Sequence, residues 1–208
     1  MAILPAIEEY YKYFHNGDRR GIFKLIIEEF QIEKAIYPGS YIHIAPSFYI
    51  PEVVYIDSFK KTEKFFIDDS ILELINQNKS YKGETKLRFY LEDFYKLIPE
   101  PLSSFDLLIS QYSGFVSQCC KKYLKPEGFL VANNSHGDAS MVSFDNDFKL
   151  IGVIYYSNNK YRYTTKHLEK YFIPKHEGYR ATIAYVKEKM KGIVYTKSPS
   201  AYIFRKVR

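Results

Sequence analysis

The chain has 208 residues, 46% hydrophobic and 26% charged, a composition typical of a globular protein with one sizeable core. No run approaches the roughly 20 apolar residues of a membrane helix, and Glu8 and Glu9 stand where a signal peptide is basic and then apolar. The two cysteines, Cys119 and Cys120, are adjacent in a predicted helix, where a disulfide between them would be strained. We therefore expect a cytoplasmic protein with free thiols and no membrane partner.

The net charge of +6 is concentrated at one end of the chain. Residues 160–208 carry 13 Lys and Arg against 3 Glu, which leaves residues 1–159 at −4. Six tyrosines interleave with these charges: Tyr161, Tyr163, Tyr171, Tyr179, Tyr185 and Tyr195. Basic and aromatic residues together can bind nucleic acid, through phosphate attraction and base stacking. The alternative is a solvated surface with tyrosines covering a sheet edge.

The predicted elements alternate between helix and strand for most of the chain. Amphipathic spacing predicts helices over residues 2–15, 19–31, 60–76 and 115–124, with Asp18 capping the second and Asp68 interrupting the third. Apolar runs predict strands at 34–38, 53–57, 87–91, 105–110, 128–133, 148–156 and 200–206, with a helix-rich insertion before the last. This order predicts a doubly wound α/β sheet, whose last two strands can pair as antiparallel neighbours.

Glycine and acidic residues follow the first three predicted strands. Gly39 follows the first, Asp57 ends the second and Asp93 follows the third. A glycine turn lets backbone approach a ligand, and a carboxylate about 20 residues later can accept hydrogen bonds from ribose hydroxyls. This pattern predicts a nucleotide-type cofactor at the carboxyl ends of the strands. The alternatives are that Gly39 only makes a turn and that Asp57 and Asp93 cap helices, the latter near 94–98.

Three later segments carry a family resemblance. Phe105-Asp-Leu-Leu-Ile-Ser110, Tyr123-Leu-Lys-Pro-Glu-Gly-Phe-Leu-Val-Ala-Asn133 and Ala201-Tyr-Ile-Phe-Arg-Lys206 are similar to the fourth, fifth and last strands of class I S-adenosylmethionine-dependent methyltransferases. The resemblance covers about residues 19–208. It implies a seven-stranded, mostly parallel, Rossmann-like sheet in a single domain, 1–208. Its parts would be N-terminal helices (1–31), a cofactor-binding core (32–156), a basic helical insertion (157–198) and the last strand (199–208).

The resemblance also implies a cofactor site for S-adenosylmethionine. Gly39 and Ser40 would face its methionine end, and Asp57 its ribose. Asp93 and Phe94 would flank the adenine, while Ser110 to Tyr112 would line the floor near the sulfonium. The full predicted set is Pro38, Gly39, Ser40, Tyr41, Asp57, Ser58, Asp93, Phe94, Ser110, Gln111 and Tyr112.

The glycine-rich loop departs from the family pattern. The family's E-x-G-x-G-x-G turn is replaced by Tyr37-Pro-Gly-Ser-Tyr-Ile-His43, which lacks the acidic start and keeps one glycine. Either the loop takes another path, with Ser40 and Tyr41 supplying contacts, or the cofactor site has been lost.

Other chemistry finds little support in the sequence. His43 lies between apolar residues, which favours a structural histidine over a catalytic base. His136 and Asp138 form either a general-base pair or part of a plain turn. The chain has no paired metal-ligand spacing, no Walker-type Gly-Lys-Ser/Thr and no Gly-x-Ser-x-Gly. Nucleic acid amino-methyltransferases are disfavoured because Ser110-Gln-Tyr-Ser113 replaces their Asn/Asp-Pro-Pro-Tyr/Phe.

Three functional hypotheses remain. The first is an S-adenosylmethionine-dependent methyltransferase for a small-molecule acceptor. The second is a catalytically inactive methyltransferase-like domain that binds nucleic acid or a protein through its basic C-terminal region. The third, a nicotinamide-dependent enzyme, ranks lowest because Gly-x-Gly-x-x-Gly is missing after the first strand.

Overall fold

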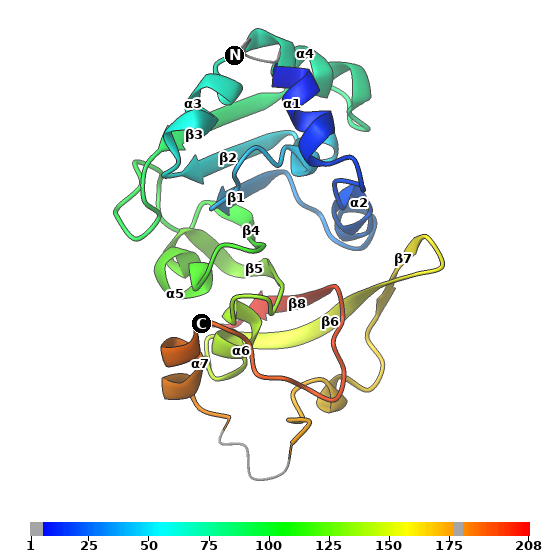
Figure 1. Cartoon of the computed structure of the whole chain (residues 1–208), viewed down its shortest axis with the longest axis vertical. Helices are drawn as coiled ribbons and strands as arrows, with labels where there is room; N and C mark the ends of the chain where they lie inside the picture. The colour runs from blue at the N-terminus through cyan, green and yellow to red at the C-terminus, as the bar shows by residue number, and fades with distance from the viewer. Residues whose placement is uncertain (1–5, 177–180) are drawn as a thin grey trace. The chain divides into compact units, whose positions relative to one another are not determined.

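The computed structural model describes residues 6–176 and 181–208, so residues 2–5 of the first predicted helix and Tyr179 lie outside the described residues. The chain divides into two compact units, Met1–Ile98 and Pro99–Arg208 (Figure 1). Each unit combines strands with helices, which confirms the predicted α/β class.

Unit 1 contains three parallel strands in the order β3-β2-β1. They are β1 (Lys34–Pro38), β2 (Glu52–Asp57) and β3 (Lys86–Leu91). The centre of β2, Val53 to Ile56, is fully buried, as the continuous apolar run requires of a strand covered on both faces. The register pairs Pro38 with Ile56 and Asp57 with Leu91, so the carboxyl ends of the three strands are neighbours.

The helices of unit 1 are α1 (Ala6–Tyr13), α2 (Arg20–Glu29), α3 (Lys60–Phe66) and α4 (Asp69–Asn78), with a 3₁₀ turn η1 (Ala45–Phe48). The predicted helix 60–76 is two helices because Asp68 caps the second, its Oδ1 accepting from the Ser70 amide at 3.0 Å. The helix expected near 94–98 does not form, since that segment consists of a turn, a bend and irregular backbone.

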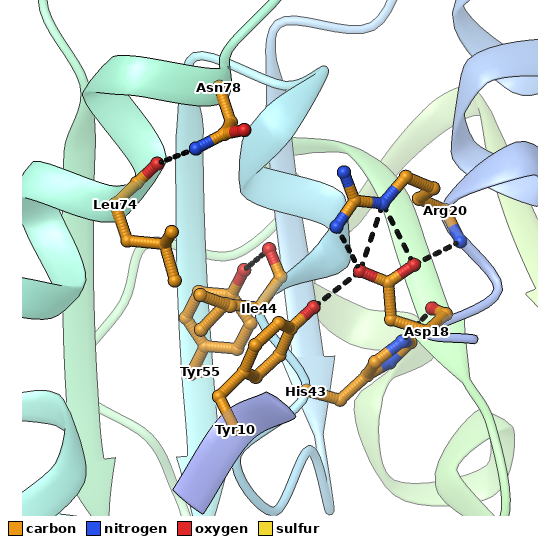
Figure 2. Close-up of polar contacts among 8 residues, drawn as sticks. All are labelled: Tyr10, Asp18, Arg20, His43, Ile44, Tyr55, Leu74 and Asn78. Carbon is orange, nitrogen blue, oxygen red and sulfur yellow. Dashed lines mark hydrogen bonds and ion pairs between the residues drawn. The ribbon is translucent and has the colours of Figure 1, made fainter. Parts of the chain in front are cut away.

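A buried polar cluster joins α1, α2 and the loop after β1 (Figure 2). The Asp18 carboxylate accepts from the Tyr10 hydroxyl at 2.6 Å and from the Arg20 amide at 3.1 Å. The Arg20 guanidinium adds an ion pair to the same carboxylate at 2.7 Å. The N-cap position of α2 is Arg19, without a side-chain cap, so the prediction that Asp18 caps this helix is wrong. Asp18 precedes the cap and links α1 to the first residue of α2 through these bonds.

Unit 2 contains five strands in the order β4-β5-β8-β6-β7. They are β4 (Phe105–Ser110), β5 (Leu124–Ala132), β6 (Phe148–Ser157), β7 (Lys160–Thr164) and β8 (Ala201–Lys206). Strands β4 and β5 are parallel, and β8 is antiparallel to both β5 and β6, which confirms the predicted pairing of the last two strands. The helices are α5 (Val116–Cys120), α6 (Asp138–Ser143) and α7 (Ile183–Lys189), with 3₁₀ turns η2 (Lys121–Tyr123) and η3 (Leu168–Lys170).

The described residues thus contain eight strands where seven were predicted. The extra strand, β7, lies in segment 157–198, whose described residues are less helical than predicted and contain η3 and α7 as their helical elements. Asn158 and Asn159 have φ of 52° and 57°, and Ser157 pairs with Lys160 across them. Two left-handed residues between paired strands make a tight hairpin turn, so the chain returns as a strand.

The tyrosines of the basic end are not a continuous exposed surface. Tyr171 and Tyr195 are buried, and Tyr195 belongs to an apolar cluster with Phe115, Met141, Val186 and Ile193. This supports the alternative in which the tyrosines cover the sheet.

Candidate functional site

The loop after β1 turns back tightly onto the end of β2. The amide of Gly39 donates to the Ile56 carbonyl at 2.7 Å, and Gly39 has φ of 64°. Tyr41 has φ of 47°, a left-handed conformation that costs an L-residue energy but is free to glycine. The loop therefore follows a path with two glycine-like positions although its sequence keeps one glycine.

Asp57 fastens this loop to the end of β2. Its Oδ2 accepts from the Tyr41 amide at 2.7 Å, and its Oδ1 accepts from the Phe59 amide at 2.9 Å, just before α3 begins. Asp57 does not cap α3, because the N-cap position is Phe59 and no side chain caps this helix, so the capping alternative is wrong. The carboxylate instead closes a turn before the helix and makes a loop contact that the sequence did not indicate. An ionised carboxylate offers about four lone-pair sites, so two remain for a ligand.

The residues after β3 lie beside Asp57, because the Glu92 amide donates to the Asp57 carbonyl at 3.1 Å. Asp93 is exposed, and its Oδ1 accepts from the Tyr95 amide at 2.9 Å. Phe94 is half-buried and stacks on the Tyr95 ring with centroids 4.7 Å apart. The structure brings these residues to the same strand ends as Pro38, Gly39, Ser40, Tyr41, Asp57 and Ser58. Their role in binding a cofactor stays a prediction.

His43 is a structural residue. It is fully buried, its Nε2 donates to the Asp18 carbonyl at 2.5 Å, and its Nδ1 accepts from the Tyr37 hydroxyl at 3.0 Å. Burial, with Arg19 nearby, lowers the pKa of His43 to about 3, which keeps the ring neutral. The reading of His43 as a catalytic base is wrong, because both ring nitrogens are occupied.

In unit 2, a buried carboxylate lies behind the end of β4. Asp138 accepts at 2.5 Å from the Ser110 hydroxyl, at 2.5 Å from the Ser117 hydroxyl and at 3.0 Å from the Ser117 amide. Burial raises the pKa of Asp138 to about 6, against the lowering effect of these hydrogen bonds. His136 is exposed, and the hydrogen bonds of Asp138 go to serines, so the proposed His136 and Asp138 base pair does not form.

Two buried amide groups lie at the carboxyl ends of β4 and β5. Ser110 pairs with Ala132 in the sheet, and the Asn133 amide donates to the Ser110 carbonyl at 3.1 Å, so Gln111 and Asn133 follow neighbouring strands. Gln111 is 3% exposed and Asn133 8%. Gln111 Nε2 and Asn133 Nδ2 have no hydrogen-bond partner within the described parts of the chain. Tyr112, next to Gln111, is 51% exposed with φ of 64°.

Asn134 anchors the segment beside these amides. Its Oδ1 accepts from the Ser140 amide at 3.0 Å and from the Ser140 hydroxyl at 2.8 Å, and its Nδ2 donates to the Ile193 carbonyl at 3.0 Å. A Cβ on Gly192 would lie 2.2 Å from the Asn134 carbonyl oxygen, so only glycine fits there. The loop after β5 is thereby held between α6 and the chain leading to β8.

Sequence reasoning missed Asn133, Asn134 and Ser117. Ser117 and Asp138 are 21 residues apart, and only the parallel pairing of β4 with β5 brings their loops together. The polar string Asn133-Asn-Ser-His-Gly-Asp138 was a visible signal, but it does not show which of its members are buried.

The described residues contain no group of three or more His, Cys, Asp and Glu placed to hold a metal ion, and none of their helices is long and apolar enough to cross a bilayer. Both cysteines are free thiols, as predicted. Burial raises the pKa of Cys120 to about 12, so this thiol is inert as a nucleophile.

No protein-family model matches the chain, and no curated protein matches it. Solved structures similar to it include YcgJ from Bacillus subtilis, at 19% identity over 59% of this chain and 54% of that protein, with a TM-score of 0.41. A putative S-adenosyl-L-methionine-dependent methyltransferase from Methanococcus maripaludis aligns at 18% identity over 62% and 61%, with a TM-score of 0.47. A methyltransferase from Geobacter sulfurreducens aligns at 14% identity over 78% and 89%, with a TM-score of 0.49. The chain thus spans between half and two thirds of the length of the first two proteins. At these low identities, the similarity is one of fold alone.

Proposed function

We propose that the chain is an S-adenosylmethionine-dependent methyltransferase that acts on a small-molecule acceptor. One observation carries the proposal: the turn from Gly39 to Tyr41 is hydrogen-bonded to the Asp57 carboxylate at the carboxyl ends of parallel strands. Ligands of open α/β sheets bind at such ends. The single-domain organisation, 1–208 with a core at 32–156, belongs to this proposal.

The residues of unit 1 fit the adenosine part of the cofactor. Asp57 keeps lone pairs for two ribose hydroxyls after accepting from Tyr41 and Phe59. Asp93 is exposed and has a second oxygen for an exocyclic amine, while the half-buried Phe94 ring offers a face to a base. The positive φ at Gly39 and Tyr41 lets the backbone of the loop approach the ligand closely.

S-adenosylmethionine supplies an activated methyl group when it is bound. The work left for the protein is to hold that group in line with the acceptor, since positioning supplies much of the catalysis in such displacements. No strong acid or base is required, which agrees with a neutral, buried His43 and an inert Cys120.

The test is calorimetric titration of the full chain with S-adenosylmethionine and S-adenosylhomocysteine, with NAD as control. We expect micromolar binding of the first two, and loss of at least tenfold in affinity in Asp57→Ala. The matched control is Asp68→Ala, which removes another aspartate that accepts from a backbone amide next to a helix of unit 1 but leaves the strand ends untouched. Absence of binding by the wild-type chain, or equal affinity in both variants, contradicts the proposal.

A further inference from the structure

The unpaired amides after β4 and β5 are an unusual feature of unit 2. Buried side-chain amides nearly always have a hydrogen-bond partner, because a buried donor without one loses its hydration and gains nothing in return. Gln111 Nε2 and Asn133 Nδ2 both lack a partner in the described residues, and they follow adjacent positions of one parallel strand pair. Two unpaired donors that follow neighbouring strand ends point to one shared acceptor.

The surroundings of these amides hold them in place. The Asn133 carbonyl oxygen accepts from the Ala139 amide at 3.2 Å, and its Oδ1 accepts from Ser135, which fixes Nδ2 as the free end. Its neighbour Asn134 is locked by three hydrogen bonds to Ser140 and Ile193. A donor that is already held in place is suited to bind a ligand, because binding then costs little conformational entropy.

We propose that Gln111 and Asn133 form a binding site for a neutral carbonyl oxygen, such as that of an amide. Side-chain amides donate well to carbonyl oxygens, which accept two hydrogen bonds. A carboxylate is disfavoured because the neighbouring Ser110 already donates to the buried Asp138 carboxylate, and a second anion beside it would be repelled. Gln111 also belongs to the predicted S-adenosylmethionine set, but the carbonyl site rests on the two unpaired donors alone and is tested without cofactor.

The experiment follows the side-chain NH₂ signals of Gln111 and Asn133 by NMR in the ¹⁵N-labelled full chain at pH 7. Both signals, assigned through their own backbone, are titrated with N-methylacetamide as a neutral carbonyl and with acetate as an anion. We expect a saturable downfield shift of both signals with N-methylacetamide and none with acetate. The absence of a shift with either probe would mean that these donors bind neither ligand. A shift with acetate as large as that with N-methylacetamide would mean that the site binds anions. Either result overturns the proposal.

Variants separate a binding role from a structural one. Gln111→Met and Asn133→Leu remove the unpaired donors and keep similar volume, so each should weaken N-methylacetamide binding at least tenfold. The thermal unfolding midpoint of Gln111→Met should stay level or rise, since Nε2 makes no internal hydrogen bond. That of Asn133→Leu should fall only slightly, because the two Ser135 bonds to Oδ1 are lost with the side chain. Gln118→Met is the matched control, because that exposed amide already donates to Ser117 at 3.3 Å, and it should leave binding unchanged. Unchanged binding in both test variants contradicts the site, even where S-adenosylmethionine binds normally.

Discussion

The polar side chains at the strand ends of unit 1 and of unit 2 differ in how completely they are hydrogen-bonded. In unit 1, both ring nitrogens of His43 are hydrogen-bonded, so this side chain is fully satisfied inside the chain. Each oxygen of Asp57 accepts from one backbone amide, which holds the loop after β1 and leaves about two lone-pair sites of the carboxylate for a ligand. In unit 2, Asp138 is equally well satisfied, but Gln111 and Asn133 keep unpaired donors. Groups that are fully satisfied inside the chain stabilise the fold, whereas unpaired ones are available to a ligand. By this criterion His43 and Asp138 support the fold, whereas Gln111 and Asn133 can bind a ligand.

The largest effect should follow from removing the buried carboxylate of unit 2. Asp138→Ala leaves the Ser110 hydroxyl and both donors of Ser117 without their acceptor, so we expect a loss of about 3 to 4 kcal/mol in the free energy of unfolding. Denaturant unfolding measures it. Asp147→Ala is the control, because this more exposed aspartate forms a surface ion pair with Lys121 and should cost little. Equal losses in both variants would show that Asp138 is not the structural centre of this loop.

The raised pKa of Asp138 predicts that the free energy of unfolding depends on pH. Its folded-state pKa of about 6 lies above the ordinary value of 3.8, so between these values the unfolded chain has lost a proton that the folded chain keeps. The contribution of Asp138 is fully present below pH 3.8 and decreases by up to about 3 kcal/mol as the pH rises to 6. The stability difference between the wild-type chain and Asp138→Ala should therefore shrink from pH 4 to 6 and stay constant above pH 7. A difference that grows over this range contradicts the raised pKa.

Apolar runs and turn residues predicted most of the fold. The strands β1 to β4 start and end within one residue of their predicted bounds, because a buried parallel strand needs an apolar run that few other elements share. The hairpin at Asn158 and Asn159 was missed because the basic residues around it were read as a helical surface. Its signal was present, since two asparagines between alternating tyrosines favour a tight turn.

The candidate site was less predictable than the fold. The sequence places Asp57 at a strand end, but it does not show that the Tyr41 amide would return to it from 16 residues away. Likewise, Gln111 was predicted from its place after β4, while Asn133 was not, since its burial depends on how the loops of unit 2 pack. Whether a buried polar side chain has a hydrogen-bond partner depends on tertiary contacts, and no local sequence pattern encodes those contacts.

Asn133 and Asn134, which are adjacent in the loop after β5, should differ in how much they contribute to stability. Asn134→Ala removes three hydrogen bonds and leaves the Ser140 amide and the Ile193 carbonyl unpaired, which should cost about 2 to 3 kcal/mol. Asn133→Ala removes only the bonds from the amide and the hydroxyl of Ser135, which is exposed to solvent, so its cost should be about 0.5 kcal/mol. Thermal and denaturant unfolding of both variants measure the difference. A reversed order would mean that the unpaired Asn133 amide, and not Asn134, supports the loop.

A smaller expected effect than that of Asn134 concerns Tyr41, where the cost of the left-handed backbone can be separated from the contribution of the side chain. Tyr41→Gly relieves the left-handed strain but loses the ring contact with Tyr13, whose centroid is 4.7 Å away, so the net change should stay within about 1 kcal/mol. Tyr41→Ala loses the ring and keeps the strain, so it should be less stable than the glycine variant by about 1 kcal/mol. If the loop approaches a cofactor through its backbone, Tyr41→Gly should retain or increase the affinity for S-adenosylmethionine, measured by calorimetry. A large loss of affinity in the glycine variant would instead mean that the tyrosine ring makes the contact, and that the backbone path of the loop serves only the fold.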